Sequence, residues 1–317
     1  MNRIKWIVNF FLIMIIYVIF TILIKIGIID DYIKLNIFLI LINIILAVSL
    51  NLINGITGQF SLGHAGFMAI GAYTTAILTI DFSIPFYIAL LISGIIAMLF
   101  GLIIGLPVLR LRGDYLAIAT LGFGEIIRII IQNIDYLGGA SGINDIPRGL
   151  DWTGFYVITT ISVLIILNII NSSYGRAMIA IREVEIAADS MGINPTFYKV
   201  LSFMIGSFFA GIGGSLYAGY FGFIQPDIFN FFKSIDILVI VVLGGLGSIS
   251  GSIISAIILT VISAMLQSFP QFRMVLYSLL LIIIMLFRPQ GLLGTKEIRI
   301  ANIFSRVFGG DSYAKSK

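Results

Sequence analysis

The chain has 317 residues, of which 59% are hydrophobic and only 11% are charged, and its mean hydropathy is +1.11. Ordinary soluble domains carry about 25% charged residues, so this composition excludes them and indicates an integral membrane protein in a lipid bilayer. The chain has no cysteine and one histidine, His64, which excludes disulfides, thiolate metal sites and multi-histidine metal sites. The net charge of +4 comes mostly from residues near predicted membrane surfaces, so we expect no nucleic-acid partner and no cofactor.

Ten apolar runs are candidate membrane helices, because crossing a bilayer takes about 20 apolar residues. They are 7–24, 35–53, 66–80, 84–109, 115–133, 154–170, 200–220, 235–244, 249–267 and 274–287. The run 235–244 is about half as long as a bilayer requires. We therefore predict an all-α polytopic membrane protein with about 9–10 membrane segments, including broken or re-entrant helices. No small-residue cleavage site follows the first run, so we expect an uncleaved span and not a signal peptide.

The placement of lysine and arginine predicts the orientation, because cytoplasmic loops are enriched in both. With a cytoplasmic N-terminus, thirteen of the 19 lie inside, Arg128 lies in a span, and five lie outside: Lys25, Lys34, Arg148, Lys233 and Arg273. The inverted orientation would reverse this ratio. We therefore expect residues 1–294 to form one membrane domain with a cytoplasmic N-terminus, a cytoplasmic loop at 172–199 and a basic cytoplasmic tail at 295–317.

A glycine-rich break precedes the run 66–80, in the stretch 54–71 (NGITGQFSLGHAGFMAIG). Irregular backbone at membrane depth is tolerated only where protein or a water-filled cavity surrounds it, and many transporters hold substrate at broken helices. We favour a role in a translocation path over close packing by small residues. The candidate path residues here are Gln59, Ser61, His64 and Gly66.

A second break occurs at 244–251 (GGLGSISG) and matches the first loosely. The match is compatible with an internal duplication. In that case the spans around the two breaks would face each other across a shared path, and 235–244 would be a re-entrant or half-length helix.

Two charges, Glu125 and Arg128, lie three residues apart inside the run 115–133. Charges within a membrane span are costly and usually face the bundle interior in pairs. We favour an ion pair that fixes helix packing, and a lining of the path or a subunit contact is the alternative. No catalytic constellation is present, and no G-x-x-x-x-G-K-[ST] phosphate loop occurs, so ATP hydrolysis by that route would require another chain.

The stretch 172–199 is rich in charge, unlike the rest of the chain. Its apolar residues recur with the spacing of one helical face, at Ala177, Ile181, Val184, Ala188 and Met191. This pattern predicts a short amphipathic helix that ends at Gly192, Asn194 and Pro195. The polar face mixes arginines with acids, which disfavours anionic lipid and favours a groove on a partner protein.

Four motifs resemble one known family: 51–73 (NLINGITGQFSLGHAGFMAIGAY), 109–129 (LRLRGDYLAIATLGFGEIIRI), 180–193 (AIREVEIAADSMGI) and 287–294 (FRPQGLLG). In this order they resemble the permease subunits of branched-chain amino acid ABC importers, in the LivM-like form, over roughly residues 35–294. Such permeases dock a Glu-Ala-Ala-x-x-x-Gly loop into a cleft on the ATPase subunit. This chain departs from the pattern because Ile186 stands at the acid position. The candidate ATPase-coupling residues are Arg182, Glu185, Ala187, Ala188 and Gly192.

The resemblance implies a transporter subunit in the inner (plasma) membrane and not an enzyme. Its expected partners are a second homologous permease, two ATP-binding subunits and an extracytoplasmic substrate-binding protein. The path would carry branched-chain or related hydrophobic amino acids by alternating access. Two alternatives stay open: a permease for urea or short-chain amides, whose motifs are very similar, and an ion-coupled secondary carrier that would use Glu125, Arg128 or His64.

Overall fold

The protein is described from a computed structural model, in which residues 2–27, 29–111, 113–266 and the single positions 275, 279, 282, 286, 291, 292 and 294 are placed. The predicted span 274–287, the motif 287–294 and the tail 295–317 therefore lie outside the continuously described part. Residues 36–295 form one compact unit, while helix α1 (Asn2–Lys25) belongs to another and is described only by itself. The expected single domain over 1–294 thus stays a prediction.

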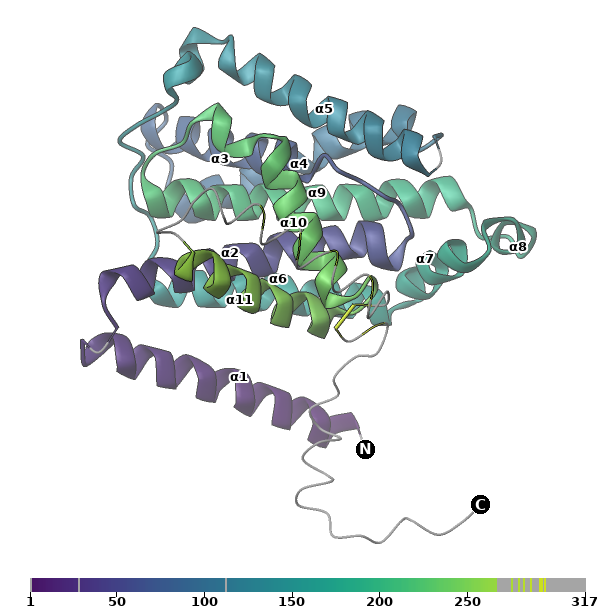
Figure 1. Cartoon of the computed structure of the whole chain (residues 1–317), viewed down its shortest axis with the longest axis horizontal. Coiled ribbons are helices and arrows are strands. Elements are labelled where there is room, and N and C mark those ends of the chain that lie inside the picture. Colours follow the sequence, from purple (N-terminus) through teal and green to yellow (C-terminus); the bar gives the residue numbers. More distant parts are fainter. Residues whose placement is uncertain are drawn as a thin grey trace, which may run out of the picture. The chain divides into compact units, whose positions relative to one another are not determined.

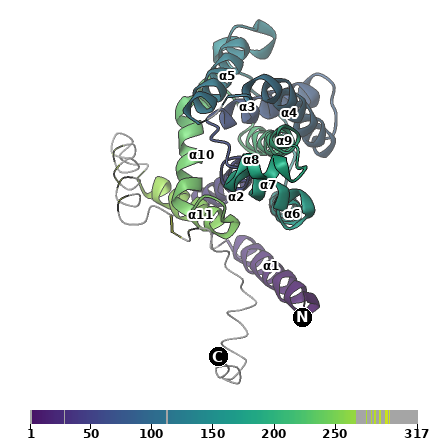
Figure 2. The same cartoon turned by 90° about the vertical axis from the view of Figure 1, so that its right-hand side faces the viewer.

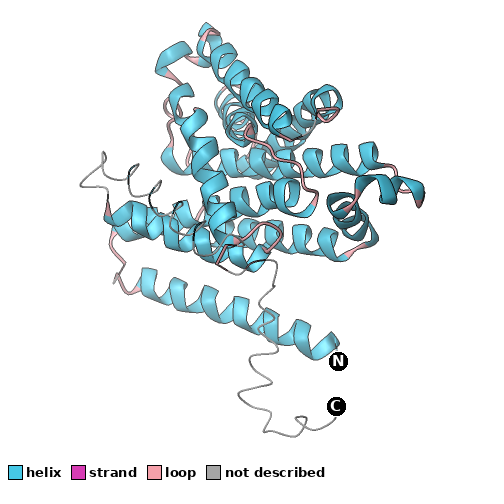
Figure 3. Ribbon diagram, turned by 45° about the vertical axis from the view of Figure 1, so that its right-hand side comes forward, coloured by secondary structure: helices cyan, strands magenta, loops and turns pink. Residues whose placement is uncertain are grey.

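Helices build the described part of the chain, as predicted, and Figure 3 shows no strand there. The long helices after α1 are α2 Asp31–Asn51, α3 His64–Ile80, α4 Phe86–Val108, α5 Asp114–Gln132, α6 Trp152–Asn171, α9 Pro195–Phe221, α10 Phe231–Gly244 and α11 Ile249–Met265. The short ones are η1 Leu52–Ile56, η2 Asp135–Leu137, η3 Gly139–Ser141, α7 Ser173–Glu183, α8 Glu185–Ser190 and η4 Pro226–Phe229. With α1 included, nine of the ten predicted spans correspond to these helices, and the tenth is 274–287.

Within the part of the chain that the structure describes, four helical segments are long and apolar enough to cross a bilayer, judged by length and composition: Asp31–Ile56, Phe86–Val108, Trp152–Asn171 and Pro195–Phe221. Ile13–Ile26, His64–Ile80 and Ile249–Met265 are shorter apolar helices. The chain is therefore a multi-pass membrane protein, and the cytoplasmic N-terminus stays a prediction.

Helix α9 lies near the centre of the unit and packs against both α3 and α4, which also contact each other (Figure 1). Small residues let these helices approach closely, since a Cβ on Gly71 of α3 would lie 2.1 Å from the Gly211 carbonyl oxygen of α9. The buried hydroxyl of Ser215 on α9 accepts a hydrogen bond from Thr75 Oγ1 of α3 at 2.8 Å. It also contacts the hydroxyl of Ser93 on α4. Small residues and interhelical hydroxyl bonds are the usual means of packing helices in membranes, where lipid removes most of the hydrophobic driving force.

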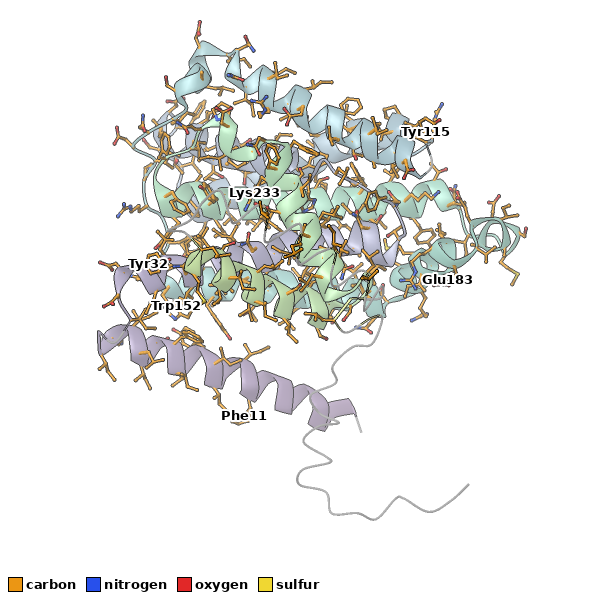
Figure 4. All side chains as sticks on the ribbon, in the orientation of Figure 1. Phe11, Tyr32, Tyr115, Trp152, Glu183 and Lys233 are labelled. Atoms are coloured by element: carbon orange, nitrogen blue, oxygen red, sulfur yellow. The ribbon has the colours of Figure 1, made fainter. Side chains whose placement is uncertain are left out.

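Helix α10 runs across the others: Figure 2 shows α4, α6 and α9 nearly end-on and α10 along its length. It begins at Phe231, four residues before the predicted start, and its 14 residues span about 21 Å, less than the bilayer core of about 30 Å. Lys233, which the sequence placed in an outside loop, lies instead in the first turn of α10, with its Nζ 3.4 Å from Asn43 Oδ1 of α2 (Figure 4). The helix therefore extends beyond its apolar run, and the outer placement of Lys233 stays a prediction.

Candidate functional site

The first break separates α2 from α3. Helix α2 continues into the π-helical turn η1, after which residues 57–63 form no regular helix and α3 begins at His64. Gly58 has a positive φ of 75°, a conformation that other residues rarely adopt. Gly63 lies where a Cβ would come within 2.3 Å of the Thr120 carbonyl oxygen of α5. The glycines predicted to break the helix therefore serve a turn and a close contact.

Side chains satisfy the polar backbone of this break. Asn54 Oδ1 accepts from Ser61 N (3.1 Å) and its Nδ2 donates to Ser61 O (3.3 Å), which closes the loop. Leu62 N donates to Thr120 Oγ1 of α5 at 2.9 Å, and Ala65 N donates to Ser234 Oγ of α10 at 3.1 Å. Unpaired backbone groups at membrane depth would each cost several kcal/mol, so protein surrounds this irregular segment as expected.

The four predicted path residues of the break, Gln59, Ser61, His64 and Gly66, contact different helices. Gln59 Nε2 donates to Lys199 O and Ser202 Oγ of α9 (3.1 and 3.2 Å), and His64 Nε2 lies 2.9 Å from Ser49 Oγ of α2. Gly66 packs on α5, where a Cβ would lie 2.9 Å from the Cα of Gly124. The buried atoms Gln59 Oε1, Ser61 Oγ and His64 Nδ1 have no hydrogen-bond partner among the described residues.

The expected pair of Glu125 and Arg128 is present on α5. Arg128 Nε lies 2.7 Å from Glu125 Oε2, and Arg128 Nη1 lies 3.1 Å from Asp227 Oδ1 of η4. Both side chains of the α5 pair are about a quarter exposed or less. Arg128 thus joins α5 to the segment that leads into α10, a partner that the sequence did not reveal. Glu125 also borders a narrow recess beside Leu62, Gly66 and Ser234.

The two breaks meet directly. Asn51, the last residue of α2, is fully buried, and its Oδ1 accepts from Gly247 N at 2.8 Å. Its Nδ2 donates to Ser248 O at 2.9 Å and to Ser252 Oγ at 2.8 Å. Gly55 lies so close that a Cβ there would come within 2.3 Å of Gly247 N. The breaks do face each other, but in contact and not across an open path; we call this contact the junction.

The predicted amphipathic helix consists of two helices, α7 and α8, and is not continuous. Val184 is extended, with φ −148° and ψ 97°, and separates them. Gly192 has φ +82° at the end, and Asn194 caps α9 by accepting from Phe197 N, so the predicted end signals are confirmed. We call residues 172–194 the coupling segment; it lies beside the start of α9 (Figure 1).

The interruption at Val184 changes which apolar residues face outward. Ala177, Ile181 and Ala188 are buried inside the chain. Val184, Ile186 and Met191 are instead 56%, 75% and 82% exposed. The predicted single apolar face is therefore wrong, because a helical projection cannot continue through an extended residue.

The predicted coupling residues also differ in their exposure and in their partners. Ala187 and Gly192 are exposed, whereas Ala188 is buried. Glu185 forms an ion pair with Lys199 of α9 (2.7 Å), and Arg182 Nη1 donates to Gly55 O at 2.7 Å. Both charges thus bind this chain itself. Asn51, Lys199 and Asp227 were missed by sequence reasoning, although Asn51 is conspicuous as a polar residue that ends an apolar run.

A metal site is not indicated, since no group of three or more His, Cys, Asp or Glu side chains that could hold an ion occurs among the described residues.

Comparison with known proteins identifies relatives of this chain. The family described as "Branched-chain amino acid transport system / permease component" matches residues 33–287. The chain is 40% identical to the high-affinity branched-chain amino acid transport system permease protein LivM of Escherichia coli K12, over 80% of this chain and 68% of that protein. It is 39% identical to LivM of Salmonella typhimurium over the same shares. It is also 33% identical to the Salmonella permease LivH, over 45% of this chain and 47% of LivH. No solved structure matches the chain.

Proposed function

Because the chain belongs to the permease family of branched-chain amino acid transport systems, we propose that it is a membrane-spanning subunit of an ATP-driven importer. It forms part of the path for leucine, isoleucine and valine. The observation that carries the proposal is the 40% identity to a LivM permease over 80% of the chain. The relatives favour branched-chain amino acids over urea or short-chain amides, two substrate classes that the motifs alone left open.

The importer would contain several chains in the inner (plasma) membrane and on either side of it. A second permease would complete the path, and the partial similarity of this chain to LivH supports such a homologous partner. Two ATP-binding subunits would hydrolyse ATP, since this chain has no phosphate loop. An extracytoplasmic protein would deliver the amino acid.

The ATP-binding subunit would dock on residues 184–192, the part of the coupling segment that contains α8. The exposed Val184, Ile186 and Met191 supply an apolar surface on a short helix, the kind of element that seats in a groove of a partner. Ile186 stands where the family pattern has an acid, so in this chain an apolar contact would replace a charged one. Ala187 and Gly192 lie exposed beside it.

The path would run beside the break between α2 and α3. Gln59, Ser61 and His64 carry buried polar atoms that have no hydrogen-bond partner in the described part of the chain. Buried polar groups rarely lack a partner unless they bind water, an ion or a ligand. Glu125 and Arg128 would line or brace the path next to the same break. ATP binding would close the ATPase pair, draw the coupling segments together and turn the cavity outward.

Reconstitution of the complete importer tests this function. We expect uptake of labelled leucine into vesicles only with ATP, the binding protein and the ATP-binding subunits present, and no uptake of labelled urea. Uptake by this chain alone, driven by an ion gradient, would instead establish a secondary carrier. Uptake of urea without leucine would establish the amide alternative.

A further inference from the structure

One arginine of the coupling segment reaches the junction of the two breaks. Arg182 lies in the last turn of α7, and its side chain is 26% exposed. Its Nη1 donates to the Gly55 carbonyl oxygen at 2.7 Å. A Cβ on Gly247 would lie 2.9 Å from the same nitrogen, and a Cβ on Gly58 would lie 2.8 Å from Arg182 Cγ. A single side chain thus touches glycines from both breaks.

The bond to Gly55 has a clear chemical reason. Carbonyl groups in the last turn of a helix have no partner within that helix, and Gly55 belongs to η1, the turn with which the helix ends. A cation is favoured at this end because the helix dipole places negative partial charge there. A hydrogen bond from a charged donor is also about twice as strong as a neutral one.

The position of Arg182 is fixed from outside by its neighbour. Glu183 Oε1 accepts from Arg182 Nη2 at 2.6 Å and from Nε at 3.1 Å. Glu183 is 64% exposed and lies at the surface (Figure 4), whereas Arg182 Nη1 donates to the Gly55 carbonyl oxygen. The guanidinium is planar, and holding two of its nitrogens directs the third.

A second connection links the other half of the coupling segment to the same break. Glu185 of α8 pairs with Lys199 of α9 at 2.7 Å. The carbonyl oxygen of Lys199 in turn accepts from Gln59 Nε2 at 3.1 Å. Both helices of the coupling segment are therefore connected to residues 55–59, α7 directly through Arg182 and α8 indirectly through Lys199.

We propose that Arg182 is a positioning residue that transmits movement of the coupling segment to the junction. This inference rests on the proposed function, because it takes the movement from a docked ATP-binding subunit. When α7 moves, the guanidinium moves the Gly55 carbonyl with it and so shifts η1 against Gly247. Arg182 would thus determine how much transport each ATP supports, and not whether the ATP-binding subunit docks.

The test uses the reconstituted importer with Arg182→Met, Arg182→Lys and the matched control Arg176→Met. Arg176 lies on the same helix, exposed, with Nη1 3.3 Å from the Asn171 carbonyl and no contact to the junction. We expect Arg182→Met to bind the ATP-binding subunit and hydrolyse ATP, with at least tenfold less leucine taken up per ATP. Arg182→Lys should recover part of this ratio, since an ammonium can still donate to Gly55. Arg176→Met should match the wild type.

A second measurement does not need transport. Two spin labels are attached to this chain, one at Tyr174→Cys on α7 and one at Leu246→Cys beside Gly247. Because the chain has no other cysteine, labelling occurs at these two positions of the chain alone. In the assembled importer, Arg182→Met should broaden the distance distribution between them, and Arg176→Met should not. An unchanged distribution with an unchanged uptake ratio would overturn the inference, and so would loss of ATPase binding in Arg182→Met. A wild-type complex without ATP-dependent uptake would refute the proposed function instead, while the spin-label result would still decide whether Arg182 holds α7 to the junction.

Discussion

Asn51→Leu tests whether hydrogen bonds hold the two breaks together. Leucine has the same number of heavy side-chain atoms and the same branch point, so it removes the polar groups while changing the shape little. It deletes the bonds to Gly247, Ser248 and Ser252. The Ser248 carbonyl keeps a bond from Ser252 N, and Ser252 Oγ keeps its bond to that carbonyl. The Gly247 amide, by contrast, loses its acceptor.

The magnitude follows from that difference. Leaving a buried donor unsatisfied costs about 1–3 kcal/mol, and each lost neutral bond contributes about 0.5–1.5 kcal/mol. Removal of a buried amide offsets part of this sum, and Gly247 is only partly buried, so water reaches it to some extent. We expect the junction to be destabilised by about 2 kcal/mol, which corresponds to a roughly 30-fold rise in the open population.

Deuterium exchange of peptides that cover residues 244–251 measures this opening. Exchange should be about 30-fold faster in Asn51→Leu, and leucine uptake should fall because the junction no longer follows Arg182. Asn171→Leu is the control, since the Asn171 side chain is exposed and donates to Leu167 O within its own helix. Equal exchange in Asn51→Leu, Asn171→Leu and the wild type would refute the view that these hydrogen bonds stabilise the junction.

Three further substitutions separate packing from docking. Gly66→Leu should block uptake and destabilise the fold by about 1–3 kcal/mol, because a Cβ would already lie 2.9 Å from Gly124 Cα; wild-type uptake would contradict the contact. Ile186→Asp should weaken ATP-binding-subunit affinity at least tenfold in a pull-down titration, because Ile186 is 75% exposed, and leave deuterium exchange at 244–251 unchanged. Ala188→Arg should make the coupling segment sensitive to limited proteolysis, because Ala188 is 5% exposed; an intact segment with weakened docking would show that Ala188 faces the partner.

The sequence predicted the features that depend on local composition. Apolar runs located the helices, because burial in lipid requires long apolar stretches whatever their partners are. The glycines of 54–71 located the first break, since each serves a local turn or a close approach such as that of Gly63 to Thr120. The i, i+3 spacing likewise predicted the ion pair of Glu125 and Arg128.

Features that depend on distant residues could not be predicted in this way. The coupling segment followed a helical pattern through Val184, yet the chain is extended there, and Ala188 faces its own chain. The partner of Arg182 is 127 residues away, and that of Asn51 is 197 residues away. A local pattern identifies a charged or polar side chain, but it contains no information about which remote carbonyl will accept its bond.

The chemistry of the junction suits a part that must open and close. Close packing by apolar side chains resists small displacements, because interiors are dense and relax little. The junction is instead held by glycine backbone, one buried amide at Asn51 and one guanidinium at Arg182. Each such contact is worth only about 1–3 kcal/mol. A ligand shifts an equilibrium only by the difference between its affinities for the two states. A partner whose affinities for two positions of the coupling segment differ by about 1–3 kcal/mol can therefore open or close the junction.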